Sequence, residues 1–299
     1  MCFYGSSGKE VVEMMKRISS KTAKITAAVL ALSLAAAPMA YAGEAEPTEV
    51  LLFAAASLNT VMTDLAERYQ EENPDVKIVI NADSSGTLLT QIREGYECDI
   101  FFSAAQKQMN QLEEDGLVVE GTRADVLNNQ VVLVTAKGSG TKVTGLDNLQ
   151  EAESIALAGG SVPVGKYTRV ALINMGILKE TEEPDKITTA EVSEALGGVE
   201  ISEQANVSKV LLAVAEGSCE VGTTYFSDTY GYEDQVEILE TVSYDLTGDV
   251  IYPVCRVVNQ EADDAQNAAA DGFYEYILSD EAKEIFDSYY FDINLEPEE

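Results

Sequence analysis

Four segments of the chain place small, neutral residues where a strand is expected to pass into a helix. They are residues 54–57, 83–87, 163–166 and 206–208. The free N–H groups and the dipole of a helix N-terminus favour anions. Four such ends brought together, with two serine hydroxyls and one tyrosine hydroxyl, could hold a tetrahedral oxyanion through uncharged donors alone.

The two serines of these segments, Ser57 and Ser85, also have a simpler interpretation. Serine is a preferred N-cap residue, so each hydroxyl could serve only to close its own helix. Residues 49–55 read as a buried strand, and apolar side chains then recur at helical spacing from Ser57 onwards. The sequence therefore predicts a helix that Ser57 opens, and both interpretations of the two serines stay open.

Composition excludes most other chemistry. The 299 residues contain no histidine, which removes His-dependent nucleophilic catalysis and imidazole metal sites. Residues 160–166 are close to a phosphate-binding nucleotide loop, but Tyr167 stands where that motif needs Ser or Thr, and Pro163 lacks an N–H. A formal net charge of −33 argues against a nucleic-acid partner, because phosphate binding needs clustered Lys and Arg. An enzyme would have to use carboxylates, Lys, Tyr or Cys, and the many acidic residues single out no general acid–base pair.

The N-terminal region has the three-part pattern of a secretory signal. Basic residues over 16–24 precede an apolar run over 25–37, and small residues flank Tyr41 before a cleavage point after Ala42. The prediction is a signal peptide over 1–42 and a soluble, exported protein, periplasmic or extracytoplasmic; an uncleaved anchor helix is the alternative. No Cys follows the apolar run to accept a lipid. The three later cysteines, an odd number, allow at most one disulfide.

The order of elements predicts an α/β protein with two lobes. Strands alternate with helices, which is typical of parallel sheets covered on both faces. We expect residues 43–130 and 251–299 to form lobe I and residues 131–250 to form lobe II. Two strands that cross between the lobes would make a hinge, with a ligand cleft between the lobes at the carboxyl ends of the strands.

Several motifs along the mature chain resemble one family. The similarity is carried by Phe53–Leu58, Ser84–Leu88, Cys98–Ala104, Asn129–Val134, Val162–Tyr167, Gly222–Asp228 and Tyr252–Val254. In this order they resemble the periplasmic molybdate-binding proteins of ABC importers. The resemblance implies a type II solute-binding fold that captures molybdate, and tungstate with it, and delivers the ion to a membrane permease.

The resemblance also implies which residues contact the ion. Ser57 matches a Ser that offers its hydroxyl and N–H, and Ser85 matches a second Ser. Val164 and Val207 match positions that donate a backbone N–H, and Tyr225 matches a Tyr that donates its hydroxyl. On this basis we expect no catalytic residue, no cofactor, molybdenum only as the bound oxyanion, and a monomeric protein.

Departures from the family pattern leave alternatives. Gly86 replaces a more usual Ser, Val164 a more usual Ala, and Lys166 adds a cation near the site. The same fold could bind sulfate, phosphate with Asp83 as the acceptor for its proton, or a small organic acid with Arg169 as a clamp. An exported enzyme on a similar fold is a further alternative.

Overall fold

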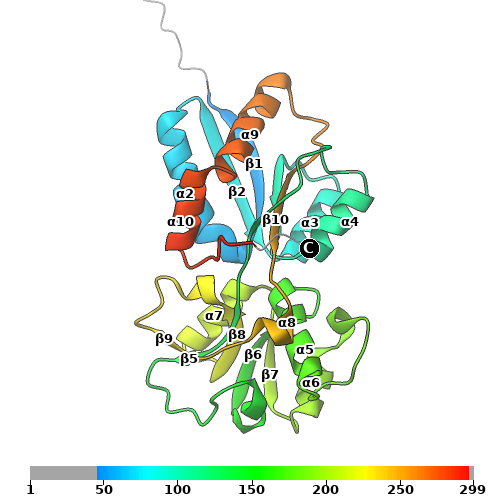
Figure 1. Ribbon diagram of the computed structural model, residues 1–299, viewed down its shortest axis with the longest axis vertical. Coiled ribbons are helices and arrows are strands. Elements are labelled where there is room, and N and C mark those ends of the chain that lie inside the picture. The colour runs from blue at the N-terminus through cyan, green and yellow to red at the C-terminus, as the bar shows by residue number, and fades with distance from the viewer. Residues whose placement is uncertain (1–45, 296–299) are drawn as a thin grey trace, which may run out of the picture. The chain divides into compact units, whose positions relative to one another are not determined.

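Two five-stranded sheets form the framework (Figure 1). The computed structural model describes residues 46–295, so the predicted signal peptide and its cleavage point lie outside the described residues. The first sheet has the order β2-β1-β3-β10-β4, with β1 Thr48–Ala55, β2 Val76–Asp83, β3 Ile100–Phe102, β4 Ala124–Leu127 and β10 Tyr252–Arg256. The second has the order β7-β6-β8-β5-β9, with β5 Val131–Ala136, β6 Ser154–Ala158, β7 Glu200–Gln204, β8 Val221–Tyr225 and β9 Val236–Thr241.

Two connections carry the chain between these sheets. Residues 128–130 lead from β4 to β5, and residues 242–251, which include a short helix, lead from β9 back to β10. The two-lobed α/β fold predicted from the sequence is thus confirmed. The lobe boundaries at 130/131 and 250/251 stay a prediction.

The sheets are mixed, whereas the alternation of strands and helices predicted parallel ones. Strand β1 is parallel to β2 and β3, but β10 is antiparallel to both β3 and β4. In the second sheet β6 is parallel to β7 and β8, while β5 is antiparallel to β8 and β9. The exceptions centre on β5 and β10, the two strands that enter a lobe from the other one. In each case the preceding strand belongs to the other sheet, so no strand–helix–strand crossover within one sheet imposes parallel pairing.

Helices cover both sheets. Lobe I has η1 Ala56–Leu58, α2 Asn59–Glu72, α3 Ser85–Arg93, α4 Gln106–Glu114, α9 Asp264–Ile277 and α10 Asp280–Ser288. Lobe II has η2 Leu146–Glu151, α5 Pro163–Asn174, η3 Pro184–Lys186, α6 Thr189–Ala195, α7 Val207–Ala215, η4 Phe226–Thr229 and α8 Tyr244–Thr247. Gly116 and Gly176 follow α4 and α5 with φ of 71° and 75°, as expected of helix C-termini.

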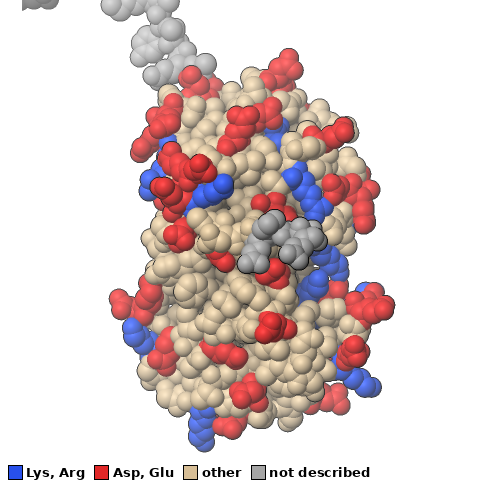
Figure 2. Space-filling view, viewed as in Figure 1, with Lys and Arg blue, Asp and Glu red and all other residues tan. Residues whose placement is uncertain are grey.

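The central strands of both sheets contain many of the most deeply buried residues. Residues 131–134 of β5 are fully buried, and Leu52 and Phe102 are buried in the first sheet. Cys98, Cys219 and Cys255 are buried free thiols. Among the helices of residues 46–295, none combines the length and apolar character that a bilayer crossing requires. Acidic side chains are scattered over the visible surface of both lobes and outnumber the basic ones (Figure 2).

Candidate functional site

A small cavity of about 10 Å³ lies between the two lobes, and it brings together all five residues that the sequence predicted. Lobe I contributes the end of β1 with η1, the start of α3, and the residue after Ser103; lobe II contributes the starts of α5 and α7 and the end of β8. The lining residues are Ala55, Ala56, Ser57, Ser84, Ser85, Ala104, Val162, Pro163, Val164, Val207 and Tyr225. Residues up to 170 positions apart in sequence therefore meet at the ends of helices and strands.

The helix caps argue against the simpler interpretation, in which Ser57 and Ser85 only close their own helices. Ser84, not Ser85, is the N-cap of α3, and its hydroxyl accepts the Thr87 N–H at 3.2 Å. Ser57 lies inside η1, whose N-cap is Ala55, so the prediction that Ser57 opens the helix as its cap was wrong. The physical reason is that the chain turns into a 3₁₀ helix before α2 begins, so the N-cap falls two residues earlier, at Ala55. Neither hydroxyl is consumed by a cap.

The serine hydroxyls are held by other groups. The Ala104 N–H donates to Ser85 Oγ at 2.9 Å, and Ser57 Oγ lies 2.9 Å from the hydroxyl of Tyr252. Ser85 is fully buried and Ser57 is 8% exposed. Each hydroxyl is therefore fixed in position at the cavity wall by a partner from the same lobe.

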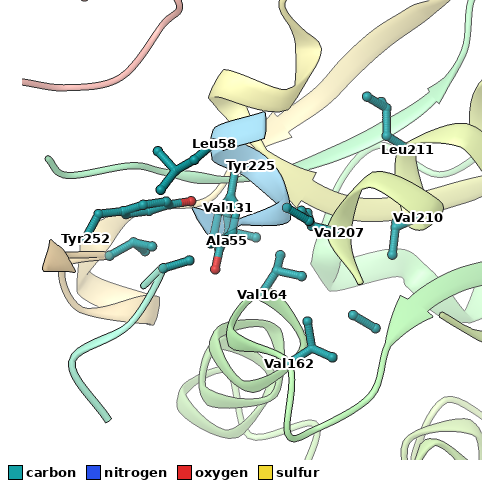
Figure 3. Close-up of a cluster of buried hydrophobic side chains, with 14 of the residues drawn as sticks. Ala55, Leu58, Val131, Val162, Val164, Val207, Val210, Leu211, Tyr225 and Tyr252 are labelled. Carbon is teal, nitrogen blue, oxygen red and sulfur yellow. The ribbon is translucent and has the colours of Figure 1, made fainter. Parts of the chain in front are cut away.

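Among the described residues that line the cavity, Tyr225 is the one with a buried polar side-chain atom that has no hydrogen-bond partner. Its side chain is 1% exposed, and its hydroxyl finds no hydrogen-bond partner anywhere in residues 46–295. Figure 3 shows it among Ala55, Val164 and Val207, with the Tyr252 ring packed edge-on at a centroid distance of 5.9 Å. Burial raises the Tyr225 pKa well above its usual value, so the phenol stays a donor. An unpaired buried hydroxyl is costly, and it faces the cavity.

Backbone donors come from the first turns of α5 and α7. Val164 and Val207 occupy these turns, where N–H groups have no partner within the helix. Asn206 caps α7 by accepting the Lys209 N–H at 3.1 Å, which leaves the N–H of Val207 at the cavity. The α5 terminus is positioned by Gly165, where an added Cβ would lie 2.2 Å from the Gly159 oxygen. Only glycine allows this helix to start so close to β6.

The charged candidates lie outside the cavity lining. Asp83 Oδ1 accepts the Ser84 N–H at 2.7 Å and an Asn206 amide N–H at 3.1 Å. Arg169 is fully buried and donates to the carbonyls of Ala158, Gly165 and Ile187; burial lowers its pKa to about 10. Lys166 lines a separate pocket. The donors around the cavity are therefore uncharged.

Two features of the site were missed from the sequence. Tyr252 and Asn129 join Ser57 in a buried hydrogen-bond chain, with Asn129 Nδ2 3.1 Å from the Tyr252 hydroxyl. Lys107 of α4 and Asp185 of η3 form an ion pair of 2.5 Å between the lobes. No spacing rule could predict either, because the partners are 78 to 195 residues apart.

Fold and cavity together define a two-lobed solute-binding protein of the type II class. The chain belongs to the family of bacterial extracellular solute-binding proteins, whose family model matches residues 50–292. The molybdate-binding protein ModA of Escherichia coli is 32% identical over 271 residues, covering 88% of this chain and 95% of that protein.

Two further proteins are similar over most of their length. A protein of Bacillus subtilis named as an ABC transporter substrate-binding lipoprotein is 29% identical over 279 residues, covering 93% of this chain and 99% of the relative. A solved substrate-binding domain described as part of a molybdenum ABC transporter of Clostridium difficile is 30% identical, with a TM-score of 0.58. The match covers 83% of this chain and 99% of that structure.

Proposed function

We propose that this protein captures molybdate, together with tungstate, outside the cytoplasm and delivers the ion to the permease of an ABC importer. The observation that carries the proposal is the convergence of uncharged donors on one buried cavity, with the Tyr225 hydroxyl unpaired. A tetrahedral dianion would give that hydroxyl and the N-terminal N–H groups of α5 and α7 their missing acceptor. Hydrogen bonds to a charged acceptor contribute about 1.5–3 kcal/mol each.

The acidity of the chain does not oppose this function. Surface charges are screened within about 8–10 Å at physiological ionic strength. The donors act at contact distance, and the side chains that line the cavity carry no charge. An oxyanion inside the site is thus governed by its hydrogen bonds rather than by the net charge of −33.

Selectivity follows from fixed donors on two lobes. Molybdate and tungstate are tetrahedral and nearly equal in size, so the same donors reach both ions. The oxygens of the smaller sulfate ion could not reach every donor at once, and each unpaired buried donor costs about 1–3 kcal/mol. The proposal therefore includes discrimination against sulfate.

The alternative ligands receive less support from the site. Phosphate would use Asp83 as acceptor, but that carboxylate is already engaged by Ser84 and Asn206. An organic acid would use Arg169 as a clamp, but its guanidinium is fully buried, and its Nε and Nη1 donate to three backbone carbonyls. Both groups also lie outside the cavity lining.

The remaining parts of the proposal concern the protein as a whole. We propose a monomeric binding protein with no catalytic residue and no cofactor, exported by a signal peptide that is cleaved after Ala42. Lobe I comprises residues 43–130 and 251–299, and lobe II comprises residues 131–250. The division of strands between the two sheets supports these boundaries.

A thermal-unfolding panel tests the function. The chain from residue 43 is heated with molybdate, tungstate, sulfate, phosphate or citrate, and a ligand at 100 times its dissociation constant should add about 2.7 kcal/mol to the free energy of unfolding. We expect large shifts with molybdate and tungstate only. A shift restricted to phosphate, sulfate or citrate would show that the site is specific for that ligand instead of molybdate. No shift at all would reject the proposed function.

The matched variant for this panel is Ser85→Ala, which removes one hydroxyl at the cavity wall. We expect the affinity for molybdate to fall about 10- to 100-fold, as for the loss of one hydrogen bond to an anion. Ser288→Ala, whose hydroxyl donates to the Ile285 carbonyl at the end of α10 and outside the cavity lining, is the control. Equal affinities in wild type and Ser85→Ala would exclude Ser85 as a ligand.

A further inference from the structure

A second pocket between the lobes, which we call the basic pocket, collects positive charge. It has a volume of about 220 Å³ and is formed by α3 and α4 of lobe I and by the start of α5 and η3 of lobe II, on one side of the molecule (Figure 1). The charged residues in its lining are three basic ones and one acidic one, Arg93, Lys107, Lys166 and Asp185. The whole chain has 19 basic and 52 acidic residues, so the basic pocket is far richer in positive charge than the rest of the protein.

Lys166 is the basic residue of this pocket whose charge is not paired. Lys107 is paired with Asp185 and Arg93 with Asp115, each at 2.5 Å, whereas Lys166 takes part in no ion pair within residues 46–295. The Lys166 side chain is half-buried, and burial, followed by the charge of Lys107, lowers its pKa. Because an anion beside it would stabilise the charged form, the position of Lys166 favours a negatively charged ligand.

A buried amide in the same pocket also lacks a partner. Gln108 of α4 is 6% exposed, and its Oε1 has no hydrogen-bond partner in the part of the chain that the structure describes. Rotation of the terminal amide exchanges its oxygen and its nitrogen, so the same side chain can offer an N–H to an anion. A buried polar group without a partner is costly, and a bound oxyanion would remove that cost.

The basic pocket adjoins the cavity that the five predicted residues line. Gly86 and Ser161 belong to the pocket, and their chain neighbours Ser85 and Val162 belong to the cavity. The lobes touch at this boundary, since a Cβ added to Gly86 would lie 3.0 Å from the Ser161 carbonyl oxygen. Separation of the lobes at this contact would connect the two spaces, so the basic pocket lies on a route into the cavity.

We propose that the basic pocket is an outer docking site, where the oxyanion binds to Lys166 and the Gln108 amide before it enters the cavity. The inference rests on the proposed function and deepens it, because it concerns an earlier step in the capture of the same ion. A positive charge at the entrance raises the local concentration of a dianion and therefore its association rate. Because Lys166 lies outside the cavity lining, it should affect the entry of the ion more than its release.

Stopped-flow kinetics of molybdate binding test the docking site. The full chain without its signal peptide is mixed with molybdate, and the change in tyrosine emission gives the association and dissociation rate constants. In Lys166→Met the association rate constant should fall about three- to tenfold at low salt, because one positive charge no longer acts on a dianion at close range. The difference from wild type should shrink as salt is added. Lys166→Arg keeps the charge and should restore most of the rate.

Lys209→Met is the matched control. Lys209 follows Val207 by two residues, as Lys166 follows Val164, and both lysines lie near the start of a helix that begins at the cavity. Lys209 is exposed and lines neither the cavity nor the basic pocket. Both substitutions change the net charge equally, but we expect Lys209→Met to bind at the wild-type rate within about twofold, since an exposed charge is screened.

Gln108→Met tests the amide separately. It should slow association about two- to threefold, because one hydrogen bond to the docked ion is lost. The stability of the ligand-free protein should stay the same or rise slightly, because a buried polar group without a partner is removed.

The possible outcomes separate this proposal from the proposed function. Slower association in Lys166→Met, with Lys209→Met unchanged and dissociation little affected, supports the docking site. Equal losses in the two lysine variants would overturn it, since net charge alone would then explain them. A wild-type association rate in Lys166→Met, or an effect confined to dissociation, would overturn it too. Calorimetric titration of wild type comes first, and if it shows no molybdate binding, the proposed function fails before any variant is compared.

Discussion

Ser84 and Ser85 show that neighbouring identical residues can have different tasks. Ser84 closes α3, whereas the Ser85 oxygen is held by Ala104 and its proton remains available. The family resemblance predicted five ligand-contacting residues, and in the structure all five line one cavity. Residue types alone could not distinguish a helix-capping serine from a serine that binds the ion, because both roles use the same hydroxyl. Asn129 and Tyr252 could not be predicted, since their roles depend on long-range contacts.

Because the Tyr225 hydroxyl is unpaired, its removal should lower the affinity for the ligand without lowering the stability of the ligand-free protein. In Tyr225→Phe the affinity for molybdate should fall about 10- to 100-fold, because one donor to the anion is lost. The ligand-free protein should keep its stability or gain slightly, because a buried hydroxyl without a partner is removed. Calorimetric titration and unfolding without ligand measure the two effects. Strong destabilisation of the ligand-free variant would show that Tyr225 serves the core.

A pH prediction follows from Asp228, in η4 after Tyr225. Its carboxylate accepts the Tyr225 N–H at 3.0 Å and the Thr224 hydroxyl at 2.9 Å, and burial raises its pKa from 3.8 to about 7. The folded state thus holds this proton over a range in which the unfolded chain has released it. This group therefore lowers the free energy of unfolding as pH rises from about 4 to about 7.

Asp228→Asn should remove that part of the pH dependence, because an amide does not titrate. Denaturant unfolding of wild type and variant between pH 4 and pH 8 measures it. As pH rises, the free energy of unfolding of the variant should increase relative to that of wild type. Parallel stability profiles would contradict the raised pKa of Asp228.

At the scale of elements, strongly apolar strands and long helices were predictable, and elements with few apolar residues were not. Strand β7 has a polar, largely exposed sequence and lies at a sheet edge, so it shows no apolar pattern. Strand β4 and helix α6 were missed because each is short and buries few apolar side chains, two in β4 and one in α6, whereas the three-residue β3 is wholly apolar. The antiparallel pairing of β5 and β10 was missed because the alternation of strands and helices along the chain does not indicate which strands enter a sheet from the other lobe.

The closeness of α5 to β6 gives a prediction for Gly165→Ala. The added Cβ would lie 2.2 Å from the Gly159 oxygen and 2.4 Å from that of Ala158, so the helix start must move away from the cavity. We expect a loss of about 1–3 kcal/mol in stability and a weaker affinity for molybdate. Thermal unfolding and titration test both effects.

Gly272→Ala in α9 is the matched control. Its added Cβ would lie 2.6 Å from the Tyr69 hydroxyl, which is the far end of a side chain and can shift. We expect unchanged affinity, because α9 contributes no residue to the cavity. Equal losses of affinity in both variants would show that the α5 start has no special role.

At the scale of the whole molecule, the cavity is too small for a five-atom ion without some parting of the lobes. A volume of about 10 Å³ is close to that needed for one water molecule. Contacts across the cleft should therefore influence binding. The Lys107–Asp185 pair is one of them, and the Asn206 amide bonded to Asp83 is another. Burial alone would raise the Asp185 pKa, but the hydrogen bond and the charge of Lys107 outweigh it and hold that pKa below its usual range.

Lys107→Met should strengthen molybdate binding about two- to fivefold, because the ion pair stabilises an arrangement of the lobes that is too close for the ion, and a partly exposed pair contributes about 0.2–1 kcal/mol. Added salt should lower the affinity of wild type less than that of the variant, because screening also weakens the pair. Lys77→Met, which removes an exposed pair with Glu49 inside lobe I, is the control. If both variants bind like wild type at low salt, the inter-lobe pair does not hold the lobes in this arrangement.

The aromatic rings that meet across the cleft give the protein an optical reporter of its own state. Tyr225 faces Tyr252, and Tyr230 packs on Tyr289 at a centroid distance of 4.3 Å, with one member of each pair from each lobe. The chain has 14 tyrosines and no tryptophan. Without indole to accept energy, the ultraviolet emission of the protein is dominated by tyrosine. Separation of the lobes would change the surroundings of both pairs, so ligand exchange can be followed in real time without a label.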